Sequence, residues 1–434
     1  MGKNILSAAE RIEAKFGGKW EPAGSGILKP PAAISTGSLL MDEAIGDCKG
    51  YPEGSVIEVY GPQHSGKTLM GYLAIASSQR KNPKRPNIII DAENQFRFQS
   101  RWAQKLGVDV SKLFIKPVIT GEEAFDILEM IILGDVELNA DGEVKRVVTP
   151  GDYGIIMVDS VTQLVPLELI HKGMDESQRM GLVAAMMSKG LKKILSAMIL
   201  AQSKTIIFFI NQTRMDPNAA KFHRNPESRT GGTALPFYDT ISFRVSKISK
   251  SEERDDRGKI FAHQAKIKFD KNKVGGLPAD PIVIRIRYDG VGIDQNAELF
   301  SVAEMNGLIK PIKKGRFNFI KPGTEDELVD ESIDSFKQED FQEVLNEHPN
   351  FKQMIIQFIQ QGKFYFQKDV QEDNPEVSEL SNVPAIEDKV VEKVEVVGRD
   401  EVLEPKQASE VVESVVPESV TESDTKLRRR RKTE

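Results

Sequence analysis

Short apolar runs alternate with longer amphipathic stretches between residue 34 and about residue 288. The runs at 56–60, 87–90, 113–117, 155–158 and 206–210 have the apolar content of buried strands. The stretches between them have the length and the spacing of helices. Apolar strands separated by helices are typical of a parallel sheet that is covered on both faces. The pattern therefore predicts an α/β core with a mostly parallel, twisted sheet.

A different pattern precedes this core. Within residues 4–16, Ile5, Ile12 and Phe16 share one helical face, and Gly17 and Gly18 follow as a stop. An isolated amphipathic helix must bury its apolar face on its own core or on a neighbouring subunit. We therefore expect a helix and a linker in residues 1–33 and the core in residues 34–288.

Two further regions follow the core. Residues 289–366 predict a smaller α+β domain with helices near 340–345 and 351–360. Residues 367–434 are rich in acids and contain no aromatic residue, which predicts a disordered acidic tail. Inside the core, the Asp141-Gly142 pair predicts a β-hairpin over 137–144.

The segment from Gly61 to Thr68 fits the pattern G-x-x-x-x-G-K-[ST] between a predicted strand and a predicted helix. In this pattern, backbone N–H groups and the N-terminus of the helix surround phosphate groups. Lysine supplies a charge for the β- and γ-phosphates, and the hydroxyl residue is placed to bind Mg²⁺. The segment predicts a nucleoside triphosphate site, against the alternative of a chance glycine-lysine turn. The expected phosphate-binding residues are Gly61, Pro62, Gln63, His64, Ser65, Gly66, Lys67 and Thr68.

Polar residues follow three of the predicted strands, where open α/β sheets bind their ligands. Glu93 lies just past the strand at 87–90, where a carboxylate could orient an attacking water. Asp159 ends the strand at 155–158 and is a candidate for the Mg²⁺ shell, the alternative being an ordinary helix cap. Gln212 follows the strand at 206–210, where its amide could contact a γ-phosphate.

Composition limits the class of protein. The chain has one cysteine, Cys48, so neither an intrachain disulfide nor a thiolate metal cluster is possible. With no membrane-length apolar run and no apolar signal-peptide core near its start, we expect a cytoplasmic protein. The formal net charge of −6 comes from the tail. The tail ends in a basic cluster that fits either a nucleic-acid contact or a solubilising end: Lys426, Arg428, Arg429, Arg430, Arg431 and Lys432.

In their order, these segments resemble the RecA family of recombinases from the N-terminal helix to about residue 360. The matching segments are Ile34-Ser35-Thr36-Gly37-Ser38, Asp91-Ala92-Glu93, Val158-Asp159-Ser160-Val161, Met180-Gly181-Leu182, Asn211-Gln212-Thr213-Arg214-Met215, Thr230-Gly231-Gly232 and Lys271-Asn272-Lys273. The resemblance implies a RecA-like P-loop core, with ATP and Mg²⁺ as cofactors. It also implies that Glu93 activates the hydrolytic water and that Gln212 senses the γ-phosphate.

The resemblance further implies contacts between subunits. Lys271 and Lys273 would reach the ATP of the adjacent subunit, and Ile12 and Phe16 of the first helix would pack on a neighbour. Phe237 matches an interface aromatic, with a core position as the alternative. Trp102 matches an aromatic that stacks on adenine, with a packing role as the alternative.

Two segments carry the expected DNA contacts. Residues 169–180 and 213–232 lack strong helical or strand patterning, and each follows a predicted strand end. The second segment has an excess of cations, which suits phosphate contacts, although a basic loop can also be merely solvated. The expected DNA-binding residues are Lys172, Arg179, Met180, Arg214, Lys221, Arg224, Arg229, Gly231 and Gly232.

Some positions depart from the family pattern. Pro217 and residues 218–220 replace the apolar loop tip, and Ala185 stands where the family has an arginine near DNA. The expected adenine-binding aspartate is absent, and the hairpin at 137–147 is an addition. We interpret this divergence as that of a phage or other mobile-element recombinase.

The sequence therefore predicts a DNA-dependent ATPase that forms a helical filament on single-stranded DNA and pairs it with a homologous duplex. The expected partners are both DNA forms, further copies of the chain and loading or mediator proteins, with no membrane. Two alternatives remain: a ring helicase or translocase of the same fold, and a non-catalytic filament or mediator protein that binds ATP.

Overall fold

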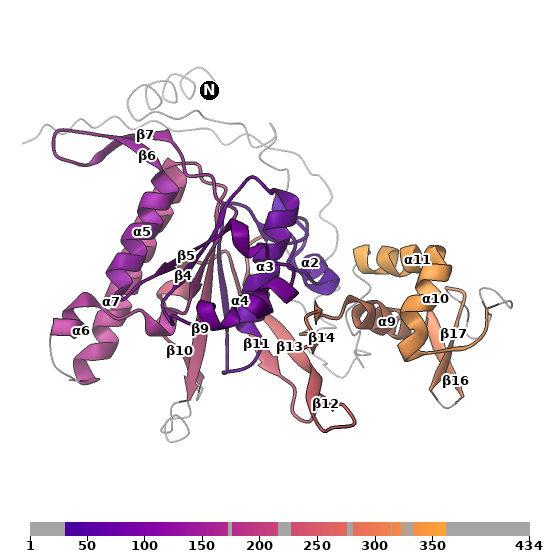
Figure 1. Cartoon of the computed structure of the whole chain (residues 1–434). Helices are drawn as coiled ribbons and strands as arrows, with labels where there is room; N and C mark the ends of the chain where they lie inside the picture. The colour runs from indigo at the N-terminus through magenta and orange to yellow at the C-terminus, as the bar shows by residue number, and fades with distance from the viewer. Residues whose placement is uncertain are drawn as a thin grey trace, which may run out of the picture. The chain divides into compact units, whose positions relative to one another are not determined.

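The computed structural model describes residues 31–171, 176–215, 227–275, 281–313, 315–322, 324, 328 and 333–361 (Figure 1). The expected first helix with Ile12 and Phe16 lies outside these residues, as does the acidic tail with its basic end. The described residues belong to one compact unit. Among them, no helix is both long enough and apolar enough to span a membrane.

A large sheet forms the centre of the molecule, in the strand order β15-β14-β13-β11-β3-β9-β8-β4-β5. All strands from β11 to β5 pair in parallel, and β13, β14 and β15 extend the sheet in antiparallel fashion. The parallel strands are β3 (Val56–Gly61), β4 (Asn87–Asp91), β5 (Leu113–Pro117), β8 (Ile155–Asp159), β9 (Ile206–Met215) and β11 (Ile241–Lys247). The antiparallel strands are β13 (Ile260–Asn272), β14 (Ile282–Arg287) and β15 (Gly292–Ile293), with β10 (Glu227–Arg229) beside β9 and β12 (Glu253–Arg254) beside β13. The predicted α/β fold with a mostly parallel sheet is confirmed.

Helices cover both faces of this sheet (Figure 1). The helices α2 (Leu39–Ile45), α3 (Lys67–Lys81) and α4 (Phe96–Lys105) pack on one face, and α5 (Gly121–Leu133), α7 (Glu176–Leu200) and α8 (Ala234–Tyr238) pack on the other. On β9, Phe208 and Ile210 belong to the first layer while Ile207 and Phe209 belong to the second. Successive strand residues point to opposite faces, so a sheet with two covered faces requires the continuous apolar runs seen in the sequence.

Shorter elements complete the core. The predicted hairpin is present as β6 and β7, and Gly142 adopts the left-handed conformation (φ +80°) in its turn. These elements are β1 (Ala33–Ile34), β2 (Tyr51–Pro52), β6 (Asp135–Leu138), β7 (Val144–Thr149), α6 (Leu167–His171) and the 3₁₀ turns Val110–Lys112 and Val161–Gln163.

The C-terminal region combines helices with a three-stranded antiparallel sheet, as the predicted α+β pattern indicates. Its elements are α9 (Gln295–Met305), β16 (Ile309–Lys313), β17 (Arg316–Phe319), β18 (Phe336–Lys337), the 3₁₀ turn Gln338–Asp340, α10 (Phe341–Glu347) and α11 (Pro349–Gln360). Aromatic rings fill its interior, and Phe319 stacks on Phe351 at a centroid distance of 4.1 Å. The core sheet continues to Ile293, beyond the boundary expected at residue 288.

A buried carboxylate joins this region to the core. Glu298 on α9 accepts hydrogen bonds from the Ser38 hydroxyl and from the Leu39 backbone N–H (3.0 Å) at the start of α2. A carboxylate at a helix N-terminus satisfies free N–H groups and opposes the positive end of the helix dipole. Burial nevertheless raises the pKa of Glu298 to about 8.

The packing of α5 on α7 yields a stability prediction. A Cβ at Gly190 would lie 2.4 Å from ring atoms of Phe125, so Gly190→Ala should lower the free energy of unfolding by about 1–3 kcal/mol despite its better helix propensity. Gly181→Ala in the same helix is the control, because a Cβ there meets no atom within 4 Å, and it should stabilise by about 0.5–1 kcal/mol. Urea unfolding measures both, and equal effects at the two sites would contradict the packing argument.

Candidate nucleotide site

The loop between β3 and α3 has the backbone shape that a phosphate cradle requires. Gly61 (φ +150°) and Gly66 (φ +104°) both lie in the conformational region that favours glycine. A Cβ at Gly61 would lie only 2.1 Å from the backbone oxygen of Val245, so no other residue fits there. The Ser65 hydroxyl inside the loop is buried and has no hydrogen-bond partner within the protein. These features fit a loop that holds phosphate oxygens.

Lys67 lies across this loop. Its side chain is buried, and its ammonium group donates a hydrogen bond to the Pro62 carbonyl at 2.6 Å. Burial lowers the pKa of Lys67, while the carboxylates of Asp159 and Glu93 act in the opposite direction. A cation with few protein partners inside a glycine-rich loop is suited to a polyanionic ligand.

The expected Mg²⁺ ligands lie together. The Thr68 hydroxyl at the start of α3 donates to a carboxylate oxygen of Asp159 at 3.2 Å, and Asp159 ends β8. Burial and the nearby Glu93 raise the pKa of Asp159 to about 7. Mg²⁺ commonly takes one or two carboxylate oxygens and completes its shell with water and substrate phosphates. The pair therefore fits the ion, and no set of three or more His, Cys, Asp or Glu side chains in the described ranges forms another metal site.

The other two strand-end residues also meet. The Gln212 amide donates to a Glu93 carboxylate oxygen at 3.2 Å, and the Ser160 hydroxyl donates to the same oxygen at 2.7 Å. In the sheet, β8 lies between β4 and β9, so parallel pairing brings these strand ends to one edge. Glu93, Asp159 and Gln212 thus form one cluster beside Thr68, although they are far apart in the sequence.

Trp102 lies on α4 and packs against the core. Its ring meets Tyr72 edge-on at a centroid distance of 5.4 Å, and it is half-buried. This geometry supports the packing role, and the exposed part of the ring leaves adenine stacking as a prediction.

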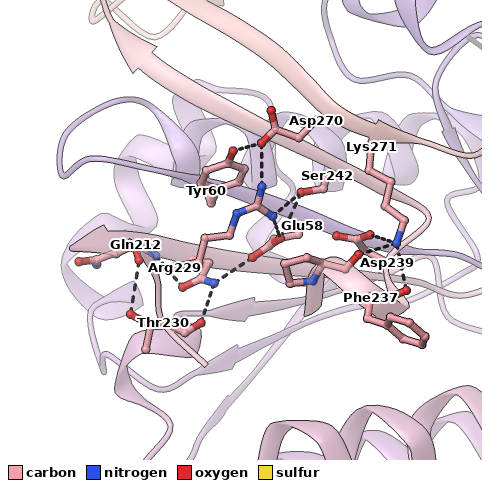
Figure 2. A network of polar contacts seen from close by, with 12 residues as sticks. Glu58, Tyr60, Gln212, Arg229, Thr230, Phe237, Asp239, Ser242, Asp270 and Lys271 are labelled. Carbon is pink, nitrogen blue, oxygen red and sulfur yellow. Dashed lines mark hydrogen bonds and ion pairs between the residues drawn. The ribbon is translucent and has the colours of Figure 1, made fainter. Parts of the chain in front are cut away.

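Of the residues expected at a subunit interface, Phe237, Lys271 and Lys273 are among the described residues. The ammonium group of Lys271 pairs with Asp239 at 2.7 Å and donates to the carbonyls of Pro236 (2.6 Å) and Phe237 (3.0 Å) (Figure 2). The Phe237 side chain is 72% exposed, so the core position considered for it is wrong. Lys273 is exposed, and partial burial together with Lys271 lowers its pKa. Exposed aromatic and cationic groups are consistent with an interface, which stays a prediction.

The two expected DNA segments contain more regular structure than their sequence indicates. Strand β9 continues to Met215, and β10 returns beside it, with Arg214 opposite Ser228. In the first segment, α6 ends at His171 and α7 begins at Glu176. The lack of regular structure expected for these segments is therefore wrong at their described ends. In the second segment, antiparallel pairing between β9 and β10 supplies backbone hydrogen bonds that the residue pattern does not signal, and the described ends of the first segment are helical.

The predicted DNA-binding residues fall into three groups. Arg214 is exposed on β9, and the positive φ angles of Gly231 (+86°) and Gly232 (+72°) turn the chain from β10 toward α8. Lys172, Lys221 and Arg224 lie outside the described residues, as do the side chains of Arg179 and Met180 in the first turns of α7.

Arg229 is the third case, and its surroundings differ from the expectation. Its guanidinium pairs with Glu58 at 2.6 Å and with Asp270 at 2.7 Å, and it lies 3.6 Å from the ring centroid of Tyr60 (Figure 2). The expectation of a loop cation free to meet DNA does not match this paired position.

Sequence reasoning missed Glu58, Asp239 and Asp270. A single acid inside the apolar strand at 56–60 was the available signal, because a buried carboxylate needs a partner. The identity of that partner depended on which strands lie side by side.

Together, the fold and the site define a P-loop nucleoside triphosphatase whose polar residues meet at the carboxyl ends of the parallel strands. The family model of the RecA N-terminal domain matches residues 3–294. The chain is 38% identical to Protein RecA of Borrelia hermsii over 317 residues, 71% of this chain and 79% of that protein. It is 32% identical to Protein RecA of Lactobacillus johnsonii (strain CNCM I-12250 / La1 / NCC 533) over 394 residues, 90% of this chain and 98% of that protein. The chain belongs to the RecA family of recombinases.

The raised pKa of Asp159 yields a pH prediction. Protonation of this carboxyl removes its charge, so the apparent affinity for Mg²⁺ in the presence of ATP should fall as pH drops through about 7, by up to tenfold per pH unit. Titration with Mg²⁺ at pH 6 and pH 8 tests this with a fluorescent ATP analogue. Asp159→Asn should bind weakly at both values. A wild-type affinity that does not change with pH would contradict the assignment.

Proposed function

We propose that the protein is a DNA-dependent ATPase that assembles into a filament on single-stranded DNA and catalyses pairing and strand exchange with a homologous duplex. The contact between Gln212 and Glu93 carries the proposal. Gln212 lies on β9, the strand that continues into the β9–β10 hairpin, and Glu93 is the candidate base. A change at the γ-phosphate therefore reaches the hairpin through one hydrogen bond.

The hydrolytic step uses residues of the cluster. Water attacks the γ-phosphorus in line, the bond to the β–γ bridging oxygen breaks, and the proton of the water passes to the Glu93 carboxylate. Lys67 binds the β- and γ-oxygens and stabilises the charge that develops on them. Bound through Thr68 and Asp159, Mg²⁺ would add positive charge at these phosphates.

The second half of the site comes from a neighbouring subunit. In the proposed filament, Lys271 and Lys273 reach the ATP of the adjacent subunit, and Phe237, Ile12 and Phe16 pack at the contact. A head-to-tail interface whose rotation does not close into a ring generates an open helix of subunits, and the proposal assigns this geometry to the filament. ATP bound between subunits would couple hydrolysis to filament stability.

DNA contacts are assigned to the segments at 169–180 and 213–232. Arg214, together with Lys172, Arg179, Lys221 and Arg224, supplies cations for phosphate oxygens, and each contact adds to the salt dependence of binding. Met180, Gly231 and Gly232 complete this surface in the proposal. Base pairing between strands, and not protein contacts to bases, selects the homologous sequence.

The acidic segment after Phe366 is proposed to compete with DNA for the same cationic surface. A negatively charged tail lowers the local concentration of a polyanion by repulsion. Loading or mediator proteins would then act by relieving this competition.

Hydrolysis with and without single-stranded DNA, followed by D-loop formation, tests the function. The proposal expects ATP hydrolysis that single-stranded DNA stimulates and homologous pairing in the same preparation. Duplex unwinding without pairing would indicate a helicase or translocase instead. Filament formation without hydrolysis would indicate a non-catalytic assembly protein.

The Glu93→Gln variant tests the assignment of the base. Glutamine keeps the shape but cannot accept the proton, so the DNA-stimulated turnover number should fall by about 10²–10⁴-fold while ATP still binds. Glu304→Gln, which alters an exposed acid on α9, is the control and should match the wild type. Normal hydrolysis by Glu93→Gln would remove Glu93 from the mechanism.

Mixed filaments test the composite site. Lys67→Ala is defective in its own phosphate loop, and Lys271→Ala is defective toward its neighbour. Each variant alone should be inactive, whereas an equal mixture should regain about a quarter of the wild-type rate, because random head-to-tail neighbours form that share of intact sites. An inactive mixture of variants that do co-assemble would contradict a site shared between subunits.

A further inference from the structure

Arg229 occupies an unusual position for a residue of a DNA-binding segment. It ends β10 and pairs across the ladder with Thr213 on β9. Its side chain is only 19% exposed. Its guanidinium carbon lies 3.6 Å from the centroid of the Tyr60 ring, and its nitrogens contact carboxylates on two different strands. The planar fork of arginine can hold two acceptors at once, whereas a lysine ammonium acts as a point charge.

Burial of Glu58 explains why this arginine is required. The Glu58 side chain has 0% exposure and lies on β3 in the middle of the sheet. Its other partners are neutral: the Asn211 amide at 2.9 Å and the Ser242 hydroxyl at 3.1 Å. Arg229 therefore supplies the positive charge that this buried carboxylate needs.

Asp270 ties the same guanidinium to a second strand. It accepts from Arg229 at 2.7 Å and from the Tyr60 hydroxyl, and it immediately precedes Lys271 on β13 (Figure 2). Lys271 in turn pairs with buried Asp239. The end of β13 is thus fixed on one side by Arg229 and on the other by Asp239.

The network also extends to Gln212, a member of the cluster with Glu93 and Asp159. Besides Glu58, the Asn211 amide contacts the Thr230 carbonyl at 3.0 Å, and Asn211 immediately precedes Gln212. One guanidinium therefore joins the strand that leads to the phosphate loop, the stem of the β9–β10 hairpin and the strand that carries Lys271.

We propose that Arg229 is a positioning residue for DNA-stimulated ATP hydrolysis: held by Glu58 and Asp270, it fixes the hairpin stem relative to Gln212 and Lys271. The inference rests on the proposed function. Arg229 then acts indirectly and not through a phosphate contact, because each of its two terminal guanidinium amino groups already contacts a carboxylate.

The Asp270→Asn variant distinguishes the two roles because they predict opposite signs. Removal of a negative charge beside a DNA-contacting arginine should strengthen DNA binding. If Arg229 positions the stem, Asp270→Asn should instead raise the single-stranded DNA concentration for half-maximal ATPase stimulation, by about tenfold for a network coupling of typical size. Asp289→Asn is the matched control, since it removes one charge from an exposed pair with Arg287 outside the network, and it should match the wild type.

Arg229→Lys provides the second variant, and it retains the positive charge beside Glu58. A lysine would preserve a phosphate contact, but it cannot bridge Glu58 and Asp270, so the positioning role predicts a loss like that of Asp270→Asn. The double variant Arg229→Lys/Asp270→Asn should be no worse than either single variant, because both break the same link. The slope of DNA affinity against salt should stay at the wild-type value in all three, since no phosphate contact is lost.

These measurements distinguish a failure of the proposed function from a failure of the positioning role. Wild-type protein whose ATPase does not respond to single-stranded DNA would contradict the proposed function itself. Wild-type stimulation with tighter or unchanged DNA response in Asp270→Asn would overturn the positioning role. In Arg229→Met, the slope of log DNA affinity against log salt concentration could fall by the amount expected for one lost phosphate contact. That result would also overturn the positioning role, in favour of direct contact.

Discussion

Parallel pairing of β4, β8, β9 and β3 brings together the polar groups that follow the strands of the nucleotide site. The pairing sets Asp91 beside Asp159 and Gly61 beside Gln212, so the carboxyl ends of the four strands meet at one edge. Glu93, Ser160 and Gln212 lie at or just past the end of this parallel pairing, and Ser160 and Gln212 therefore lie within hydrogen-bond distance of Glu93. The phosphate loop, the Mg²⁺ ligands and the candidate base depend on this register, because a slip of one residue would turn each side chain to the opposite face.

Buried charge is the second organising constraint. Glu58 and Asp239 are fully buried, and burial raises the pKa of both carboxyls. A carboxylate in such a place is stable only with a cation and further hydrogen bonds. The cations come from segments to which we assign a function in the proposal: Arg229 from the hairpin stem and Lys271 from the end of β13. The same two cations therefore stabilise buried carboxylates of the fold and have roles in the proposed ATP hydrolysis.

Much of the nucleotide site could be predicted because its signals are local. The spacing from Gly61 to Thr68, with a strand before it and a helix after it, predicts the cradle, and the acids at strand ends predict Glu93 and Asp159. The hairpin stem was harder, since β10 is short and polar and gains its structure from β9 alone. Phe237 was ambiguous because an aromatic residue in a short helix fits a core or a surface equally well, and only the fold exposes its ring.

The sequence by itself determined the alternation of strands and helices, the triphosphate loop and the family, because each depends on residues that are close in the chain. The tertiary structure decided which charges meet. Arg229, Glu58 and Asp270 are separated by 171 and 41 positions, and no local pattern relates them. Their contact follows from the order in which β3, β11 and β13 lie beside the hairpin stem, and strand order is a property of the whole sheet.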